Sequence, residues 1–243
     1  MANYITDWKR KPEELKKKHD LKREREARTF TPNGTVEINI AKAYQQQILE
    51  NDEQLVFIIF GKPGTGKSTL TLWIEYFLFG EIDLETTCFT HQDWAEQATS
   101  GQGKVIKYEE GRQTFVKRRA MGSNNKDGLD ILNIFRALNH VHIINFQNIS
   151  DVESDLLFYH CNGILWTHKL VGEKGYVSGY SPKTLRKKKV KDKIQEGELQ
   201  PGQESDFTTP FPDFKQEHPK DWQEYDRRKK ENLNEIRDRY LDN

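Results

Sequence analysis

The stretch QLVFIIFGKPGTGKST, residues 54–69, decides the fold of this chain. Its apolar run, residues 55–60, ends abruptly at a glycine-rich turn that closes in Lys-Ser-Thr. A short continuous apolar run indicates a buried strand, and the apolar spacing of residues 68–79 indicates a helix. A strand, a glycine-rich turn and a helix in this order match the phosphate-binding loop G-x-x-x-x-G-K-[ST]. We therefore expect an α/β fold built around a phosphate site.

Each position of this motif has a physical reason. The glycines let the backbone take positive φ and approach a triphosphate, while successive N–H groups and the helix N-terminus supply positive dipoles. We expect Lys67 to reach the β- and γ-phosphates and the Ser68 hydroxyl to hold Mg²⁺. The predicted cofactors are thus ATP and Mg²⁺. The residues predicted to bind the nucleotide are Gly61, Lys62, Pro63, Gly64, Thr65, Gly66, Lys67, Ser68 and Thr69.

A second motif, KVIKYEEGR at residues 104–112, ends a β-branched run in two adjacent carboxylates. In nucleoside triphosphatases with a phosphate loop, the first acid of such a pair binds the metal through water, and the second polarises the attacking water. Glu109 is therefore the predicted metal-side acid and Glu110 the predicted catalytic one. The alternative is an ordinary polar strand end, but the pair follows the phosphate loop by about 40 residues, as it should.

The composition suits one α/β domain with polar extensions. Hydrophobic residues make up 35% and charged residues 31% of the 243 positions, and the formal net charge is zero. A uniformly basic surface is therefore excluded, and attraction to DNA has to come from local patches. The apolar runs near 55–60 and 141–146 are too short to cross a bilayer. Cys88 and Cys161 lie in apolar runs, which indicates buried thiols in a reducing compartment. These features predict a cytoplasmic protein that meets membranes only through a partner.

The chain divides into four predicted parts. Residues 1–30 are a charged N-terminal arm, residues 31–180 the nucleotide-binding domain, residues 181–219 a basic run with a linker, and residues 220–243 a C-terminal helix. Seven lysines and arginines lie within residues 183–193. This run is either a contact to a nucleic-acid backbone or a solvated arm.

Strands are expected near residues 55, 87, 105, 141 and 164, separated by helices. This alternation predicts a doubly wound, mainly parallel sheet with its ligand at the carboxyl ends of the strands. Alternating apolar residues at 36–40 predict a further half-exposed strand, and a helix should follow at about 41–51. Residues 150–153 form a capping-box pattern that predicts a helix to about residue 160. The glycine-bearing stretch at 172–180 predicts an antiparallel hairpin.

The stretch FRALNHVHIINFQ, residues 135–147, adds a resemblance. Over about residues 54–170 the chain resembles the additional-strand P-loop ATPases, in particular the FtsK/HerA superfamily of DNA-pumping motors and small archaeal virus and plasmid ATPases. In these motors an arginine precedes, by eleven residues, a glutamine at the end of the fourth strand, and Arg136 and Gln147 have this spacing. The first acid of the family is usually Asp, whereas this chain has Glu109.

The resemblance implies a P-loop NTPase sheet in the order 5-1-4-3-2, flanked by helices. It implies that Gln147 senses the γ-phosphate beside Lys67 and Glu110, and that Arg136 lies near a subunit boundary. Arg118, in the polar loop after the acidic strand, is a second candidate for an arginine that acts across that boundary.

The function that this resemblance implies is a homo-oligomeric ATPase, a hexameric ring that moves double-stranded DNA during viral genome packaging or plasmid transfer. A viral capsid or a membrane-associated protein would be a further partner. One alternative is an assembly or secretion ATPase of the zonular-occludens-toxin type. Another is a nucleotide-dependent binding switch, against which the acidic pair argues because a switch needs no catalytic carboxylate.

Overall fold

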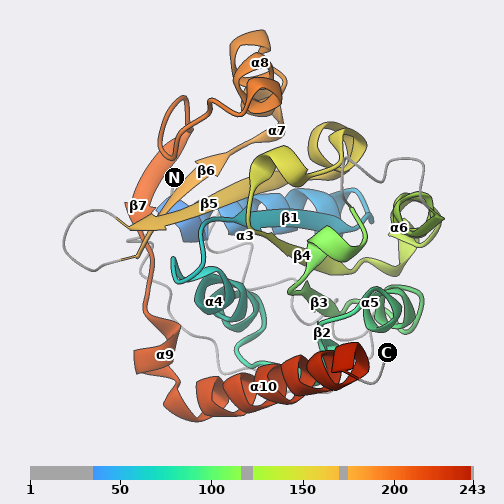
Figure 1. Cartoon of the computed structure of the whole chain (residues 1–243). Helices are drawn as coiled ribbons and strands as arrows, with labels where there is room; N and C mark the ends of the chain where they lie inside the picture. The colour runs from blue at the N-terminus through green and yellow to red at the C-terminus, as the bar shows by residue number, and fades with distance from the viewer. Residues whose placement is uncertain (1–34, 116–122, 170–174, 242–243) are drawn as a thin grey trace.

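A seven-stranded sheet in the order β2-β3-β4-β1-β5-β6-β7 forms the centre of the computed structural model, which describes residues 35–115, 123–169 and 175–241 (Figure 1). The first five strands of this order run parallel, and β6 and β7 are antiparallel to their neighbours. The strands are β1 Leu55–Phe60, β2 Thr87–Cys88, β3 Val105–Tyr108, β4 Val141–Phe146, β5 Gly163–Lys169, β6 Gly175–Tyr180 and β7 Phe207–Pro210.

The five parallel strands confirm the predicted order 5-1-4-3-2, because β4 lies between β1 and β3. The chain therefore has the α/β P-loop NTPase fold that the sequence predicts. The hairpin β5–β6 is also confirmed. One strand was not predicted: residues 207–210, in the segment expected to be a linker, pair with β6 and extend the sheet.

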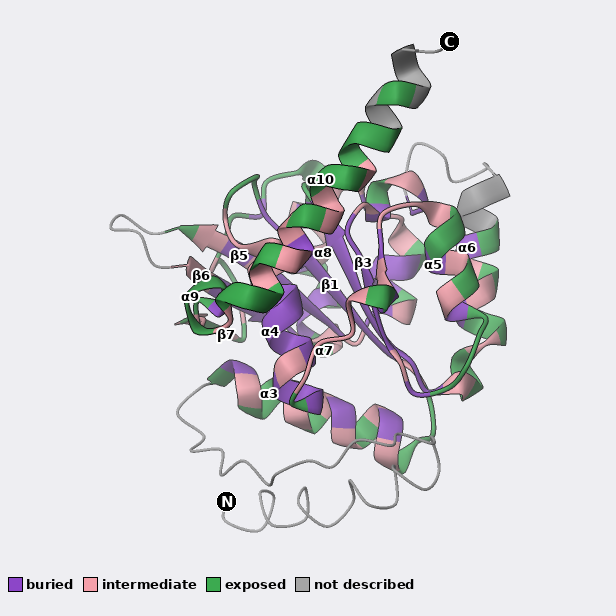
Figure 2. Ribbon diagram, turned by 90° about the horizontal axis from the view of Figure 1, so that it is seen from below, coloured by how far each residue is buried: buried purple, intermediate pink, exposed green. Residues whose placement is uncertain are grey.

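Helices cover both faces of the sheet, so the fold has three layers. Strand β1 alternates between them: Val56, Ile58 and Phe60 contribute to one core cluster, and its odd-numbered residues contribute to the other. Figure 2 shows β1 and β3 buried along their length, whereas the edge strand β7 is partly exposed. On the first face lie α5 His91–Ala98, α6 Ser123–Ile134, α7 Pro182–Leu185 and α8 Lys188–Glu196. On the second lie α3 Thr35–Tyr44, α4 Lys67–Phe79, α9 Phe214–Glu217 and α10 Pro219–Leu241.

Short helical turns join these elements. The 3-10 turns are Leu84–Thr86, Gly111–Gln113, Arg136–Leu138 and Ile149–Asp151, and the π-helical segments are Gln45–Glu50 and Leu156–His160.

Two local predictions were wrong. Residues 36–40 belong to helix α3, because Val36, Ile40 and Tyr44 face the core at helical spacing whereas Ile38 is 39% exposed. The second concerns the capping box at residues 150–153, which does not cap the predicted helix, because the backbone N–H of Glu153 donates to the Phe115 carbonyl. The turn there is capped instead by the side chain of Asn148. The helix itself is present at residues 154–160, most of it as the π-helical segment Leu156–His160, and it ends where predicted.

Both cysteines are buried and free, as predicted. Burial raises the pKa of each thiol to about 12, so neither is a ready nucleophile. None of the helices described is long and apolar enough to cross a bilayer.

Candidate nucleotide-binding site

The phosphate loop connects β1 to α4 at the carboxyl edge of the sheet, and two of its glycines are required by geometry. At Gly61 a Cβ atom would lie 2.4 Å from the carbonyl oxygen of Thr167 on β5. Gly66 is the N-cap of α4 and has φ of 94°, a left-handed conformation that side chains disfavour. The Thr65 and Thr167 hydroxyls lie 2.8 Å apart and fasten the loop to β5. The loop is thus held with the N-terminus of α4 at the site.

Lys67 folds back over this loop. Its Nζ donates to the Gly61 carbonyl at 2.8 Å and to the Lys62 carbonyl at 3.4 Å. Partial burial lowers the pKa of Lys67, and the nearby Glu109 carboxylate opposes that shift. Among the described residues, the hydrogen-bond partners of the ammonium group are therefore loop carbonyls, which phosphate oxygens can replace. Lys62, Pro63 and Gly64 are exposed at the tip of the loop.

Ser68 and Glu109, 41 residues apart in sequence, meet at the end of β3. The Ser68 hydroxyl donates to Glu109 Oε2 at 2.8 Å. Ser68 lies in the first turn of α4, and Glu109 directly follows β3 and is 8% exposed. The two residues predicted to hold the metal are therefore in direct contact.

Asn145 holds the other carboxylate oxygen of Glu109, a role that the sequence reasoning missed. Its Nδ2 donates to Glu109 Oε1 at 3.1 Å, and its Oδ1 accepts from the Thr71 hydroxyl at 3.1 Å. Asn145 is 1% exposed, so this amide is fixed at both ends. The available signal was one amide within the apolar run of β4, beside Ile59 at the end of β1.

Glu110 is half-buried and begins the turn after β3. Burial raises its pKa, the negative charge of Glu109 raises it further, and Lys229 and Lys67 act in the opposite direction. A carboxyl group with a raised pKa beside a nucleotide site is suited to accept a proton. Its catalytic role stays a prediction.

The remaining predicted residues lie farther away or outside the described residues. Gln147 follows β4 and is exposed, and its contact to the nucleotide stays a prediction. Arg136 is exposed in the turn before β4, at the opposite end of a strand about 20 Å long. It is therefore too far from the phosphate loop of its own chain, and any role in hydrolysis needs a second subunit. Arg118 lies outside the described residues.

The C-terminal segment covers the site from the second face. A Cβ atom on Gly66 would lie 2.8 Å from the ring of Phe211, which follows β7. Lys229 of α10 has its Nζ 3.4 Å from Ser68 Oγ and 3.5 Å from Glu109 Oε2. In Figure 1, α10 runs past α4 beneath the sheet. The sequence pattern predicted a helix here but not its position on the site.

The residues present fit Mg²⁺. The hydroxyl of Ser68, the carboxylate of Glu109 and the supporting amide of Asn145 are hard oxygen and hydrogen-bonding groups of the kind that Mg²⁺ sites use. Across the described ranges no three His, Cys, Asp or Glu side chains gather into a metal site. A Mg²⁺ ion here would consequently complete its shell with phosphate and water oxygens, as this ion usually does.

Comparison with known proteins gives little. No protein-family model matches the sequence, and no curated protein matches it. Among solved structures, the chain is similar to the N-terminal domain of zonular occludens toxin from Neisseria meningitidis, at 11% identity and a TM-score of 0.45. The similarity covers 66% of this chain and 94% of that one. A similarity at this level carries no argument about function.

Proposed function

We propose that this protein is a Mg²⁺-dependent P-loop nucleoside triphosphatase that uses ATP. The observation that carries the proposal is the 2.8 Å hydrogen bond from Ser68 to Glu109. It joins the hydroxyl of the phosphate-loop motif to the first acid of the second motif, at the end of the sheet where the loop backbone and Lys67 converge. A chance G-K-S turn on a structural loop would not need a buried carboxylate beside its serine.

The residues divide the chemistry between them. The loop N–H groups and Lys67 bind the phosphates and offset their charge. Ser68 and Glu109 would hold Mg²⁺, which when bound supplies further neutralisation of the phosphate charge. Asn145 orients the Glu109 carboxylate. Glu110 polarises the attacking water and accepts its proton.

Calorimetry with ATP and Mg²⁺, combined with phosphate release, tests this assignment. Lys67→Ala should abolish binding, whereas Lys42→Ala, which removes an exposed lysine of α3 outside the loop, should leave binding near the parent value. If both variants bind ATP as the parent does, or the parent does not bind it, the proposal fails.

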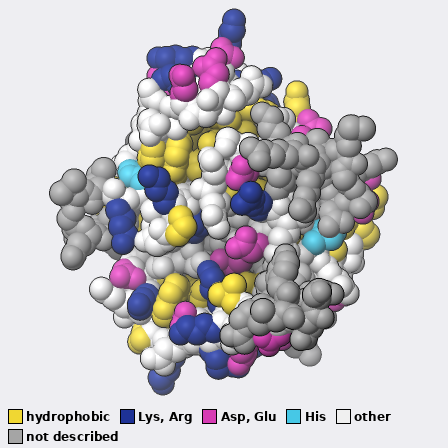
Figure 3. Space-filling view, in the orientation of Figure 1, with side chains coloured by type: hydrophobic (Ala, Val, Ile, Leu, Met, Phe, Trp, Pro, Cys, Tyr) yellow, Lys and Arg dark blue, Asp and Glu magenta, His cyan; other side chains and the backbone are white. Residues whose placement is uncertain are grey.

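The finer proposal is that hydrolysis moves double-stranded DNA. Its support is the sequence resemblance together with the lysines and arginines of α7 and α8, which lie among acidic side chains on a projecting part of the molecule (Figure 3). Lys187 and Lys188 are exposed, and Lys189 pairs with Glu204 at 2.7 Å. Neutralising these three lysines should lower the log–log salt slope of duplex binding by about 0.9 per lost phosphate contact. An unchanged slope, or equal hydrolysis with and without duplex DNA, would remove DNA from the proposal.

A ring of subunits, proposed as a hexamer, would give Arg136 its role. Arg136→Ala should then bind ATP normally and hydrolyse it on the order of a thousandfold more slowly. Mixing it with Glu110→Gln subunits should restore part of the activity, because a mixed boundary pairs an intact carboxylate with an intact arginine. Parent-rate hydrolysis by Arg136→Ala would exclude this arrangement.

A further inference from the structure

The ammonium group of Lys229 lies beside the two residues assigned to the metal, Ser68 and Glu109. Its Nζ lies within 3.4–3.5 Å of Ser68 Oγ and Glu109 Oε2, and 3.3 Å from the Tyr225 hydroxyl. The Lys229 side chain is 38% exposed, whereas that of Glu109 is 4% exposed. The carboxylate is therefore neutralised by a group that reaches in from α10.

Lys229 and a divalent cation compete for the same groups. Mg²⁺ demands near-ideal octahedral ligands and would need the oxygen of Ser68 and the charge of Glu109. Two positive charges that share these ligands repel each other strongly at such distances. Binding of the metal consequently requires the ammonium group of Lys229 to leave.

Apolar contacts bring α10 to this position. Tyr225 is 1% exposed and packs in the core of the second face together with Phe214. Its hydroxyl accepts a hydrogen bond from Lys229 Nζ at 3.3 Å, which holds the ammonium group toward Ser68 and Glu109. The helix thus closes the site with a buried aromatic residue and, one turn later, a cation.

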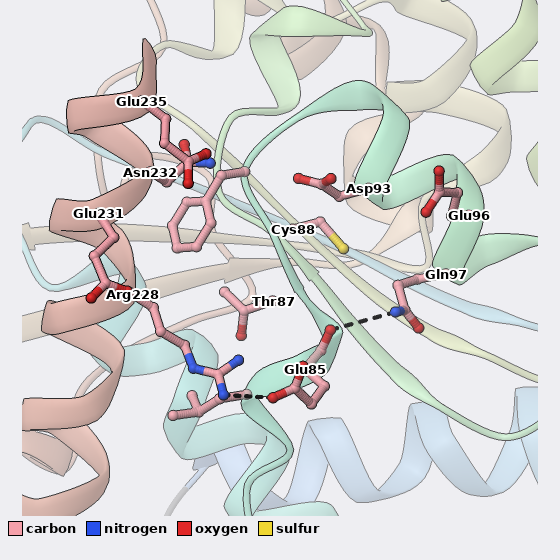
Figure 4. Close-up of a pocket in the computed structure, with 12 residues that line it drawn as sticks. Glu85, Thr87, Cys88, Asp93, Glu96, Gln97, Arg228, Glu231, Asn232 and Glu235 are labelled. Carbon is pink, nitrogen blue, oxygen red and sulfur yellow. Dashed lines mark hydrogen bonds and ion pairs between the residues drawn. The ribbon is translucent and has the colours of Figure 1, made fainter. Parts of the chain in front are cut away.

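Beyond Lys229 the helix borders a pocket. Figure 4 shows a pocket between α10 and α5 that Glu235 lines on one side and Asp93 and Glu96 line on the other. Carboxylates on both walls disfavour closure of this gap. Arg228 crosses it to pair with Glu85. In Figure 2 the C-terminal part of α10 projects from the body of the molecule.

The helix also has internal support that does not depend on the body. Arg227 pairs with Glu224 and Glu231, and Lys230 pairs with Asp226 at 2.6 Å, all within α10. Such pairs at three and four residues stabilise a helix on its own surface. When Lys229 leaves the site, these contacts remain, so the part of α10 that follows the buried Tyr225 can move as a helix.

We infer that α10 is an autoinhibitory strap: Lys229 stands in for the metal cation in the nucleotide-free protein, and Mg²⁺·ATP must displace it before hydrolysis. This inference rests on the proposed function and adds a regulatory contact to it. The strap lowers the apparent affinity of the site for Mg²⁺, and anything that holds α10 away from the site activates the protein.

The test uses the full chain with Lys229→Met, which removes the charge and keeps the length of the side chain. The matched control is Lys230→Met, the next residue, whose ammonium pairs within the helix. ATP affinity is measured by calorimetry over a Mg²⁺ series. Lys229→Met should lower the Mg²⁺ concentration for half-maximal binding roughly tenfold, a typical size for coupled sites, and Lys230→Met should leave it unchanged.

A second measurement reports the position of the helix without any turnover. Hydrogen exchange of residues 219–232 in the parent should be faster with ATP and Mg²⁺ than with ATP alone. If exchange is unchanged, the strap is wrong. If Lys229→Met raises the Mg²⁺ requirement, the strap is also wrong, and Lys229 assists nucleotide binding instead. If the parent binds ATP·Mg²⁺, Lys67→Ala does not, and Lys229→Met alters nothing, the proposed function stands and only the strap falls. If no variant binds ATP, both fall.

Discussion

Strand β3 is joined to α4 at two points, and their comparison separates a structural contact from a functional one. At the first, Lys107 pairs with Glu75 at 2.7 Å, and both side chains are at most 3% exposed. At the second, two residues along the strand, Glu109 accepts a hydrogen bond from Ser68. Each point has one buried carboxylate and one lysine, but the lysines come from different places.

Lys107 is satisfied entirely by the rigid core. Besides Glu75, its Nζ donates to the Asp83 carbonyl at 2.8 Å and to the Thr86 hydroxyl at 2.7 Å. Lys229 instead reaches Glu109 from a helix at the edge, at 3.5 Å, and is partly open to solvent. A buried charge whose partner is permanent contributes to stability, whereas one whose partner can be exchanged is available for a ligand.

The largest effect is expected from breaking the permanent pair. Lys107→Met leaves the Glu75 carboxylate buried without its cation, which costs about 3–5 kcal/mol of unfolding free energy. Denaturant unfolding at neutral pH measures this loss. A loss below about 1 kcal/mol would mean that the two lysines do not differ as described.

The same variant has a predictable pH dependence. Burial raises the pKa of Glu75 in the folded protein, and the charge of Lys107 opposes this. Without Lys107 the folded-state pKa rises further above the unfolded value, so the folded protein binds the proton more tightly. Stability then falls as pH rises between these two values. The deficit of Lys107→Met should therefore shrink as the pH is lowered toward the unfolded pKa of Glu, and a deficit that grows would contradict the assignment.

In the candidate nucleotide-binding site, Glu110→Gln should reduce the rate of ATP turnover by roughly 10²–10⁴-fold, because the amide cannot accept the proton of the attacking water. ATP binding and unfolding free energy should both stay near the parent values. Single-turnover phosphate release with calorimetric binding separates these effects. Equal loss of binding and turnover would place Glu110 among the groups that hold the nucleotide instead.

Asn145→Ala should act through Glu109 and have a smaller effect. Without the amide the carboxylate loses a fixed partner, and we expect the Mg²⁺ requirement for ATP binding to rise about 10- to 100-fold. Thr71→Val, which removes only the hydroxyl behind Asn145, should give a weaker shift in the same direction, and Thr71→Ser should restore the parent value. A change in ATP affinity that does not depend on Mg²⁺ would argue against a positioning role.

The smallest effect sharpens the comparison. Lys229→Met should change the unfolding free energy by less than about 1 kcal/mol, because Lys229 is partly exposed and Glu109 keeps its hydrogen bonds from Ser68 and Asn145. Together, Lys107→Met and Lys229→Met compare the two lysine–carboxylate pairs at β3. A loss as large as that of Lys107→Met would make α10 a permanent part of the core.

The sequence predicted those features that are encoded in a continuous stretch of residues. The loop of residues 61–69 and the pair Glu109–Glu110 are continuous motifs, so their elements and order could be predicted. Residues 36–40, which begin helix α3, were mistaken for a strand because apolar residues at 36, 38 and 40 satisfy a period of two. The exposure of Ile38 and the burial of Tyr44 distinguish the helix.

The contacts that complete the site could not be predicted in the same way. Asn145 is a single amide in an apolar strand, and its meaning depends on which strands lie beside β4. Lys229 is one of many charges on a polar helix, and only the packing of Tyr225 determines which lysine reaches Glu109. Both depend on tertiary placement, for which the local pattern contains no information.

The strand β7 has a consequence for how such a strap would operate. Residues 207–210 are fixed in the sheet, and Phe214, which is fully buried, packs against Tyr76 of α4 just before α10 begins. The chain is therefore anchored a few residues before α10 begins, close to the site that the helix covers. A short tether keeps the local concentration of Lys229 at the order of millimolar, whatever the amount of protein present. Inhibition by α10 would then be independent of protein dilution, and lengthening the segment between β7 and α9 would weaken it without altering any contact in the site.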